Sequence, residues 1–564
     1  MKDFASKLRI TLTEFLGDAY LSLISVFSSK VKLKYFCLNK VKIKISLLIV
    51  NSPEIAMKEN EYILSVDSGT TATKVALYDL GGNLITSTTR EYQLTTPKPL
   101  WVEIEIETLW REFVNGVKEV ILKSGIDPRK IISIGISAQG ETFVPISKEG
   151  KPLRRAIVWL DSRAEEEAKI LDEKFDNGQS YKITGQVKLV PTWPAAKIFW
   201  LKRHEKDTFD NAYKYLLVED YLIWRMTGEF VAEGSLLCST CYWNIVTRKW
   251  WDEMLDFLEL REEQLPEIRE SGEPIGRLKD EIAKELNLTP DVIIATGGLD
   301  QACGTIGVGN IQPGIFTENI GAALAICVIQ EKLTFDPKKR MPVHYFVKPG
   351  TYMFHTFTTG GMALRWFRDN FCNEEMNVAK LMATSPYVLI DKEVEKIPPG
   401  SEGLIMLPHL QGAMAPEANP NAKGVFFGIT LAHTKAHFAR SIMEAIACAI
   451  MRNIEVLEDL GVKVEEIRAL GGGARSKLWN QIIADVTQRP VLITNHDEDA
   501  ACMGAAMLAG VAVGIYKNIE DAARKVVKVR EKFEPNEQNF EVYRNLYKKY
   551  LSLYTSLLEL FESK

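Results

Sequence analysis

The segment YILSVDSGTTATKVALYDLGGNLITSTT, residues 62–89, decides the fold class. It holds three apolar runs that are separated by the turns DSGTT and GGN, and this pattern predicts three strands joined by tight turns. Residues 105–124 follow with apolar side chains at helical spacing, and residues 130–140, KIISIGISAQG, predict a further strand that runs into a glycine-containing loop. The alternation of strands and helices predicts a mixed α/β domain.

The second half of the chain repeats this pattern. Residues 292–301, VIIATGGLDQ, and residues 314–329, GIFTENIGAALAICVI, predict strands that are separated by glycine turns. A helix of period 3.6 is expected over 437–460, with Gly461 as its C-terminal cap. Residues 464–486 predict a strand, a glycine turn and a helix. We therefore expect two related α/β domains that face a cleft.

Composition excludes several classes of protein. The chain has 564 residues, of which 46% are apolar and 25% charged, as in ordinary soluble globular proteins. Its net charge of −5 gives no polyanion-binding signature, so we expect no nucleic-acid partner. Eight scattered cysteines argue against a secreted disulfide scaffold, and we expect a cytoplasmic protein. The uncharged stretches 301–317 and 501–516 are shorter than the ~20 apolar residues of a membrane-spanning helix, so no membrane span is expected.

Residues 1–56 differ from the rest of the chain. They hold nine Lys or Arg and four Asp or Glu. Glu14 and Asp18 interrupt the apolar part, which argues against a secretory signal. Met57 then opens MKENEYILSV, directly before the first predicted strand. Our hypothesis is that residues 1–56 are a dispensable basic extension or the product of an upstream start; a genuine basic arm is the alternative.

The turn after the first strand carries the first candidate constellation. Gly69 allows the backbone to approach a ligand closely, and the N–H groups and hydroxyls of Thr70 and Thr71 can cradle phosphate oxygens. Asp67, at the end of the strand, can hold Mg²⁺ through water. Lys74 can neutralise phosphate charge. The alternative is an ordinary hairpin turn, because the pattern is short and common.

Two further glycine-rich loops follow predicted strands. In Gly-Gly-Leu-Asp-Gln, residues 297–301, Asp300 can accept a proton from a substrate hydroxyl, the role of a general base in phosphoryl transfer. A plain helix N-cap is the alternative for Asp300. The glycines of 471–474 can let a flat ring or a phosphate approach the backbone, although an ordinary connecting loop has the same composition.

Several motifs are absent. The sequence contains no GxxxxGK[ST], which excludes a P-loop, and no HExxH. Residues 238–241 form a lone CxxC without a second pair, so we expect no zinc site there.

Together with DSGTT and GGLDQ, the segment GVFFGITLAHTKAHFARSIME, residues 424–444, resembles the C-terminal signature of the FGGY family of carbohydrate kinases, which includes xylulokinases and glycerol kinases. The resemblance covers roughly residues 60–555. It implies two actin-like, ribonuclease H-like ATPase domains that flank a cleft. Residues 57–300 would bind the sugar and form the first phosphate turn, and residues 301–564 would bind the nucleotide. It also implies ATP, Mg²⁺, a small sugar or polyol as substrate, and a possible homodimer.

The resemblance also assigns roles to single residues. Asp300 is the implied catalytic base, and Asp67 is the carboxylate associated with Mg²⁺. The implied substrate-binding residues are Gln139, Gly140, Glu141, Asp300 and Gln301. The implied nucleotide-binding residues are Thr70, Thr71, Lys74, Gly321, Ala322, Gly361, Arg365, Gly473 and Ala474.

One turn departs from the family. Many members carry Gly-Thr-Ser or Gly-Thr-Gly in the second phosphate turn, where this chain has Gly321-Ala322-Ala323. A missing hydrogen bond to a charged phosphate oxygen is expected to weaken ATP binding or slow transfer by ~1.5–3 kcal/mol.

The substrate loop, residues 137–146, matches neither close relative fully. Glycerol kinases carry Asn-Gln-Arg-Glu-Thr there, and Gly140 replaces the Arg, which we expect to open room for a larger polyol. Xylulokinases carry Gln-Met-His-Gly, and this chain lacks the Met-His pair. Trp159, Asp161 and Arg163 either pack or hydrogen-bond near the sugar.

The resulting prediction is ATP-dependent phosphorylation of a hydroxyl of a small sugar, a ketopentose such as xylulose. The alternatives are a glycerol or other polyol kinase and, from another class, a nucleotide-binding sensor or scaffold without kinase activity. An actin-like chaperone ATPase fits the C-terminal signature poorly.

Overall fold

The computed structural model describes residues 36–38, 41–43, 61–175 and 178–563. Contacts divide the chain into two compact units, residues 1–57 and residues 58–564. In the first unit, β1 (Phe36–Leu38) and β2 (Val41–Ile43) pair antiparallel. The rest of residues 1–56, and with it the hypothesis about their origin, lies outside the described residues.

The second unit begins with the predicted strand–turn–strand segment. β3 (Tyr62–Ser68) pairs antiparallel with β4 (Ala72–Asp79), which pairs antiparallel with β5 (Leu84–Glu91). β7 (Ile131–Ala138) runs parallel to β3. The helix predicted over 105–124 is α2 (Ile106–Ser124), which packs on β4 and β5 and ends at Gly125 with a positive φ of 63°. In order across the sheet, the strands are β15 (Pro274–Arg277), β16 (Ile293–Ala295), β7 (Ile131–Ala138), β3 (Tyr62–Ser68), β4 (Ala72–Asp79) and β5 (Leu84–Glu91), with β17 (Gly298–Leu299) also paired to β7.

A second seven-stranded sheet forms from the later part of the chain. The strands predicted within 292–301 do not open it, because β16 and β17 pair with β7 of the first sheet. The strand–turn–strand pattern of 314–329 gives β18 and β19, which are antiparallel, and β24 lies parallel to β18. The order of the strands is β20 (Val343–Tyr345), β21 (Tyr352–Thr359), β19 (Ala323–Gln330), β18 (Ile315–Ile320), β24 (Glu466–Leu470), β25 (Val491–Thr494) and β26 (Val529–Phe533).

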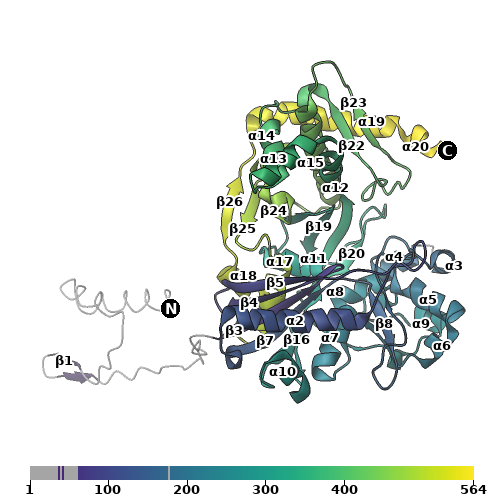
Figure 1. Cartoon of the computed structure of the whole chain (residues 1–564), viewed down its shortest axis with the longest axis vertical. Helices are drawn as coiled ribbons and strands as arrows, with labels where there is room; N and C mark the ends of the chain where they lie inside the picture. Colours follow the sequence, from purple (N-terminus) through teal and green to yellow (C-terminus); the bar gives the residue numbers. More distant parts are fainter. Residues whose placement is uncertain (1–35, 39–40, 44–60, 176–177, 564) are drawn as a thin grey trace. The chain divides into compact units, whose positions relative to one another are not determined.

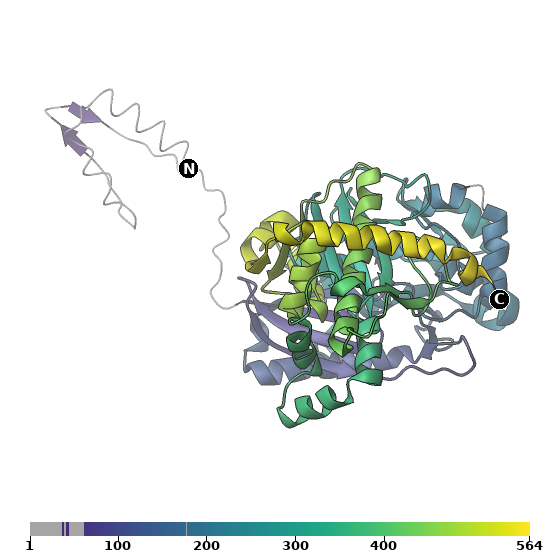
Figure 2. The same cartoon turned by 90° about the horizontal axis from the view of Figure 1, so that it is seen from above.

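Helices cover this second sheet. α15 (Lys435–Asp459) is the predicted long helix, and Gly461 follows it with a positive φ of 80°. It packs on α16 (Lys477–Thr487) and on the hairpin of β22 (Ile405–Pro408) and β23 (Gly424–Phe427). Figure 2 shows α19 lying across this half of the molecule. The other helices here are α12 (Met362–Phe371), α13 (Asn373–Leu381), α14 (Pro386–Val394), α16 (Lys477–Thr487), α18 (Ile519–Val526), α19 (Phe540–Ser556) and α20 (Leu558–Glu562).

Two helices join the sheets. α11 (Asp300–Gly307) and α17 (Ala500–Ala512) pack on each other, and α17 also packs on β3 and β7 (Figure 1). The contact is close, because a Cβ on Gly135 would lie 2.0 Å from the carbonyl oxygen of Ala505, and one on Gly504 would lie 2.0 Å from that of Cys303. The small residues of 501–516 therefore serve packing inside the fold. Among the described residues, no helix has both the length and the apolar character needed to cross a membrane.

Residues 160–290 are rich in helices, as predicted. Their strand β10 joins three strands of the preceding segment in a small sheet of the order β10–β8–β9–β6. β8 (Phe143–Ile146), β9 (Ala156–Ile157) and α5 (Pro194–His204) hold residues that belong to the candidate site. The other strands and α-helices are β6 (Glu103–Ile104), β10 (Lys214–Leu217), β11 (Val231–Glu233), β12 (Trp243–Asn244), β13 (Lys249–Trp250), β14 (Glu267–Arg269), α3 (Glu165–Phe175), α4 (Gln179–Thr184), α6 (Lys206–Asn211), α7 (Val218–Thr227), α8 (Gly234–Leu237), α9 (Asp252–Leu258) and α10 (Asp280–Leu286).

Candidate active site

Asp67 lies near the end of β3, between its two neighbouring strands. The strand register places it opposite Lys74 on β4 and Ser137 on β7. The Ser137 hydroxyl donates to Asp67 Oδ1 at 2.8 Å. Burial raises the pKa of Asp67, while the Ser137 hydrogen bond and the Lys74 charge oppose that rise. A cation beside this carboxyl would therefore favour its ionised form.

Asp300 begins α11 directly after β17, which pairs with β7 beside β3. Its Oδ1 accepts a hydrogen bond from the backbone N–H of Gln301 at 2.6 Å. Burial, followed by the nearby Asp67 carboxyl, raises the pKa of Asp300 to about 7, and Glu141 acts in the same direction. We call Asp67, Glu141 and Asp300 the carboxylate cluster.

Buried acids hold the loop that precedes Asp300. Glu219 Oε1 accepts from the Gly297 N–H at 2.7 Å, and a Cβ on Gly297 would lie only 1.5 Å from the carbonyl oxygen of Ile136. Glu233 accepts from the Ser235 hydroxyl at 2.7 Å, and that hydroxyl accepts from the Leu299 N–H at 2.9 Å. The backbone before Asp300 is thus fixed on both sides. Sequence reasoning missed Glu219 and Glu233.

The phosphate turn, residues 69–71, is tied to its surroundings. The carbonyl oxygen of Gly69 accepts from the Tyr92 hydroxyl at 2.6 Å and from the Gln139 amide at 2.7 Å. Thr70 Oγ1 accepts from the Trp159 indole N–H at 2.8 Å, which leaves its own proton free to be donated, and Thr71 is exposed.

Lys74 lies beside Asp67, but its ammonium also reaches the later part of the chain. It donates to the carbonyl oxygen of Glu498 at 3.0 Å, and the Glu498 carboxylate pairs with Arg475 at 3.0 Å. Because an ammonium has three N–H donors, this contact does not use up its capacity to bind a phosphate.

The substrate loop joins the carboxylate cluster through Glu141. Glu141 has a positive φ of 58°, its pKa is raised by burial, and the Ser239 side chain and the Lys197 charge counter that rise. The Gln139 amide donates to Gly69 and accepts from the Thr142 hydroxyl at 3.0 Å, so both of its ends contact protein. A Cβ on Gly140 would lie 3.1 Å from Leu299 Cδ1, so Leu299 lines this side of the loop. The expectation that Gly140 opens room for a larger polyol stays a prediction.

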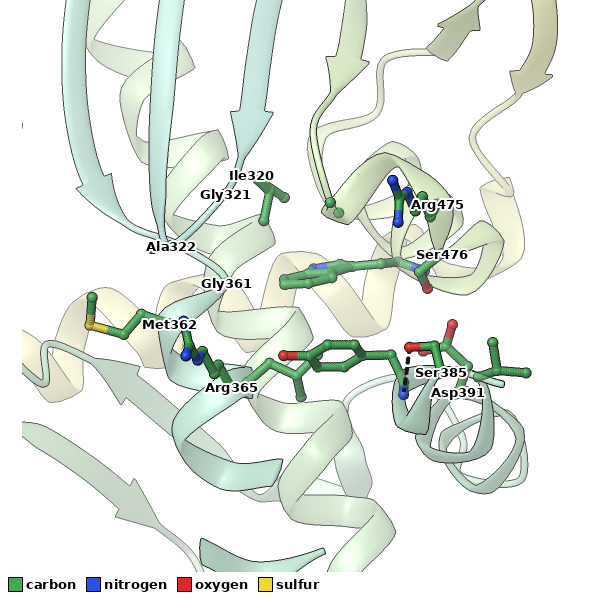
Figure 3. Close-up of a pocket in the computed structure, with 16 residues that line it drawn as sticks. Ile320, Gly321, Ala322, Gly361, Met362, Arg365, Ser385, Asp391, Arg475 and Ser476 are labelled. Carbon is green, nitrogen blue, oxygen red and sulfur yellow. Dashed lines mark hydrogen bonds between the residues drawn. The ribbon is translucent and has the colours of Figure 1, made fainter. Parts of the chain in front are cut away.

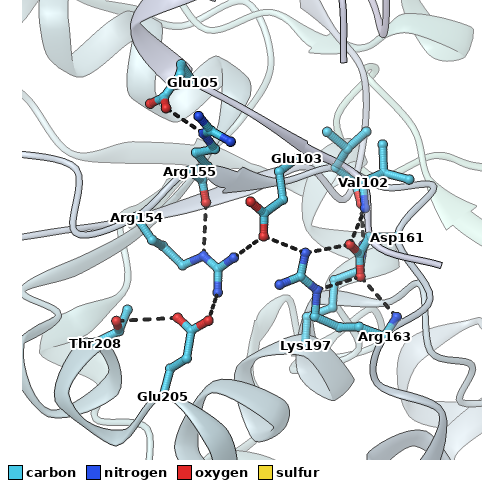
Figure 4. Close-up of polar contacts among 11 residues, drawn as sticks. Val102, Glu103, Glu105, Arg154, Arg155, Asp161, Arg163, Lys197, Glu205 and Thr208 are labelled. Atoms are coloured by element: carbon cyan, nitrogen blue, oxygen red, sulfur yellow. Dashed lines mark hydrogen bonds and ion pairs between the residues drawn. The ribbon is translucent and has the colours of Figure 1, made fainter. Parts of the chain in front are cut away.

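A buried ion network, which we define as Glu103, Arg154, Asp161, Arg163 and Lys197, adjoins this loop (Figure 4). Arg163 donates to Asp161 at 2.7 and 2.9 Å and to Glu103 at 2.7 Å, and Arg154 also pairs with Glu103. Asp161 and Arg163, predicted to pack or hydrogen-bond near the sugar, thus bind each other and neighbouring protein groups, while Arg163 Nη1 is buried without a hydrogen-bond partner among the described residues.

Lys197 connects the ion network to the carboxylate cluster. Its Nζ donates to the carbonyl oxygens of Val158 at 2.9 Å and Trp159 at 3.3 Å. Burial lowers its pKa to about 7, against the opposing charges of Asp161 and Glu141. Sequence reasoning missed Lys197; the available signal was a lysine within the otherwise apolar run of α5.

A separate cavity of about 410 Å³ lies between the β18–β19 turn, α12, α14 and α16 (Figure 3). It is lined by the predicted residues Gly321, Ala322, Gly361, Arg365 and Gly473. Ala474, also predicted, is buried beside the cavity rather than in its lining. Sequence reasoning assigned no role to Tyr387, Asp391 or Trp479, which line it as well.

Backbone contacts between two loops shape one end of this cavity. The Gly361 N–H donates to the Gly321 carbonyl oxygen at 3.0 Å, and the Met362 N–H donates to that of Ala322 at 2.9 Å. A Cβ on Gly361 would lie 2.5 Å from the Gly321 oxygen, so glycine is required for this approach. Ala322 itself is exposed.

The donor set fits magnesium that arrives with a nucleotide. Within the described part of the chain, no group of three or more His, Cys, Asp or Glu side chains is placed to hold a metal ion. Mg²⁺ commonly binds through one or two carboxylates, substrate phosphates and water, and Asp67 beside a hydroxyl-rich turn supplies that kind of partial site.

Comparison with known proteins identifies the family. Residues 62–307 match the N-terminal domain, and residues 326–513 the C-terminal domain, of the FGGY family of carbohydrate kinases. The chain belongs to the FGGY family of carbohydrate kinases. This confirms the predicted family, and with it a phosphotransferase of sugars.

FGGY kinases of different names are similarly related to it. The xylulose kinase of Bacillus subtilis is 28% identical over 490 residues, covering 86% of this chain and 95% of the relative. The gluconokinase of the same organism is 29% identical over 487 residues, covering 86% and 94%.

Solved structures of FGGY kinases confirm the predicted fold of two actin-like α/β domains. The crystal structure of xylulose kinase from Rhodospirillum rubrum matches with a TM-score of 0.82 at 25% identity, covering 89% of this chain and all of that one. A ligand-bound xylulose kinase from Lactobacillus acidophilus matches with a TM-score of 0.79 at 27% identity, covering 88% and 98%.

Proposed function

We propose that this FGGY kinase transfers the γ-phosphoryl group of ATP to a hydroxyl of a ketopentose such as xylulose, with Asp300 as the general base. The observation that carries the proposal is the position of Asp300 beside Asp67, where its pKa is raised to about 7. A carboxyl group with this pKa is matched to proton abstraction near neutral pH.

In the proposed step, the substrate hydroxyl oxygen forms a bond to the γ-phosphorus, and the bond from that phosphorus to the oxygen bridging to the β-phosphate breaks. The hydroxyl proton passes to the Asp300 carboxylate, and ADP leaves. The Thr70 hydroxyl, the backbone N–H groups of the phosphate turn and Lys74 stabilise the phosphoryl charge. Bound Mg²⁺ would neutralise charge on the phosphate oxygens, with Asp67 holding it through water.

Acceptor recognition falls to Glu141 and Gln301 in this proposal. The Thr142 hydroxyl donates to Gln139 within the loop, and the charge of the buried Lys197 acts on Glu141. Xylulose is supported by the names of several relatives and by the lack of an arginine at position 140. Glycerol or another polyol is the second candidate, because the Glu141-Thr142 pair is shared with glycerol kinases.

The test is ADP release from Mg-ATP in the presence of xylulose, ribulose, gluconate and glycerol, one at a time, with Asp300→Asn as the matched variant. We expect release that depends on xylulose and is lost in the variant, while ADP binding persists in both proteins. Release with glycerol alone would favour the polyol kinase. ADP binding without release for any acceptor would favour the sensor or scaffold.

Other expectations stay predictions. These are a domain division at residues 300 and 301, a homodimer, a cytoplasmic location and the use of Mg²⁺. Light scattering after size-exclusion chromatography would test the dimer, since a mass near 64 kDa, that of one chain, would contradict it.

A further inference from the structure

The 410 Å³ cavity has two chemically different ends. In Figure 3, Gly321, Ala322 and Gly361 lie at one end, and Ser385, Asp391 and Ser476 lie at the other. The first end offers the backbone of the glycine turns, which suits phosphate oxygens. The second end carries Asp391, the one acid among the residues that line the cavity.

Two aromatic rings offer flat surfaces to the cavity. Tyr387 and Trp479 both line the cavity, and each ring is held in place. The Trp479 indole N–H donates to the Met443 carbonyl oxygen at 3.1 Å, and the Tyr387 hydroxyl accepts from Arg368 at 3.0 Å. Aromatic faces of this kind stack on a nucleobase with little preference among bases, so selectivity must come from polar groups.

Asp391 lies beside Ser476. The Ser476 hydroxyl accepts from the Trp479 backbone N–H at 3.1 Å, so its own proton is free to be donated toward the Asp391 carboxyl; burial raises the pKa of Asp391, and the Ser476 side chain opposes that rise. Figure 3 shows the two side chains pointing toward each other. One side of the carboxyl is thus occupied, and the other remains available to a ligand in the cavity.

We propose that Asp391 selects the base of the donor nucleotide by accepting a hydrogen bond from the exocyclic amino group of adenine. This inference rests on the proposed use of ATP. A carboxylate only accepts hydrogen bonds, so an amino group satisfies it. A 6-oxo purine presents a carbonyl oxygen in the same place, and two acceptors then face each other in a partly buried site.

The test measures binding in the absence of any sugar, so that it does not depend on phosphoryl transfer. Calorimetric titration would give the dissociation constants of ADP, IDP and GDP for the wild type and for Asp391→Asn. We expect the wild type to prefer ADP over IDP by about 10- to 100-fold, the size of one hydrogen bond to a charged group. In Asp391→Asn, whose amide can donate to the 6-oxo group, we expect this preference to fall to about threefold or less.

Glu393→Gln is the matched control, because Glu393 is an exposed acid on the same helix as Asp391 and lies outside the lining of this cavity. Its ADP-to-IDP ratio should equal that of the wild type. If Asp391→Asn fails to fold, Ser476→Ala takes its place, and we expect a smaller loss of preference because the carboxylate is no longer oriented.

Two outcomes would overturn the assignment. An unchanged ADP-to-IDP ratio in Asp391→Asn would show that the carboxylate does not contact the base. Tighter binding of GDP than of ADP by the wild type would assign the carboxylate to the N1 and N2 donors of guanine. Selective ADP binding without sugar-dependent turnover would leave this inference standing and would contradict the proposed kinase instead.

Discussion

The two sides of the candidate site are built in opposite ways. Around the carboxylate cluster, charged side chains are buried and joined to one another: Arg163 and Asp161 are hidden together, and Lys197 is fully buried. Around the cavity, glycine turns, a few apolar side chains and two rings leave open space. Fixed charges suit phosphoryl transfer, in which a proton moves and charge shifts among the phosphoryl oxygens, because preorganised groups need no rearrangement during the step. A cavity lined mainly by backbone, apolar side chains and rings, with Arg365, Arg475 and Asp391 as its charged groups, suits a ligand that is bound but does not react there.

The largest expected effect separates chemistry from nucleotide binding. Asp300→Asn keeps the shape of the side chain but removes the proton acceptor, so we expect kcat to fall about 10²- to 10⁴-fold. Titration with ADP should give an unchanged dissociation constant. A parallel loss of ADP affinity would contradict the separation of the carboxylate cluster from the cavity, because it would show that the two are coupled before the reaction.

The next effect concerns stability. Lys197→Met removes the donor to the buried carbonyl oxygens of Val158 and Trp159 and the positive charge near Asp161 and Glu141, so we expect a loss of about 1–3 kcal/mol in the free energy of unfolding. Denaturant titration would measure it. Lys206→Met, at a lysine whose side chain is 73% exposed, should change stability by no more than about 0.5 kcal/mol. Equal effects in both variants would remove the distinction between the buried network and the surface.

A third prediction concerns the turn at 321–323. Ala322→Thr adds a hydroxyl at an exposed position beside the cavity, and a new hydrogen bond to a charged phosphate oxygen is worth about 1.5–3 kcal/mol. We therefore expect kcat/KM for ATP to rise about 10- to 100-fold. Ala322→Val has nearly the same shape without the hydroxyl and should not raise it. A rise in both variants would point to packing rather than to hydrogen bonding.

The smallest effect is a dependence on pH. Because burial and Asp67 raise the pKa of Asp300 to about 7, its carboxylate form predominates above pH 7 and declines below it. We expect kcat/KM for the sugar to fall about tenfold for each unit of pH below 7. A profile flat down to pH 5 would contradict Asp300 as the base or its raised pKa.

Local patterns in the sequence predicted much of the fold. The strands and turns of 62–89, the helix of 105–124 and the glycine after α15 lie where spacing and turn chemistry put them. These features depend on residues close together in the chain. The packing of α17 on β3 and β7 depends on contacts between residues more than 360 positions apart, and its glycine-rich sequence indicated only close packing.

The residues of the candidate site also divide into those that local sequence patterns indicated and those that only the fold reveals. The structure brings Asp67, Glu141 and Asp300 together and places five of the predicted nucleotide-binding residues around one cavity, while the roles of these residues stay predictions. Lys197 and Asp391 were missed because each lies in an ordinary helical pattern. Only the fold shows that one is buried beside the substrate loop and that the other faces a cavity.

The packing of α17 also determines when the first sheet can finish folding during synthesis. A ribosome that has made residues 62–300 has made β3, β4 and β7, but α17, which covers β3 and β7, is complete only at residue 512. Until then that face of the sheet is uncovered, and exposed apolar surface of this kind favours aggregation. The first domain to leave the ribosome is thus the last to be finished, and a nascent chain that stalls between these points is a natural client for chaperones.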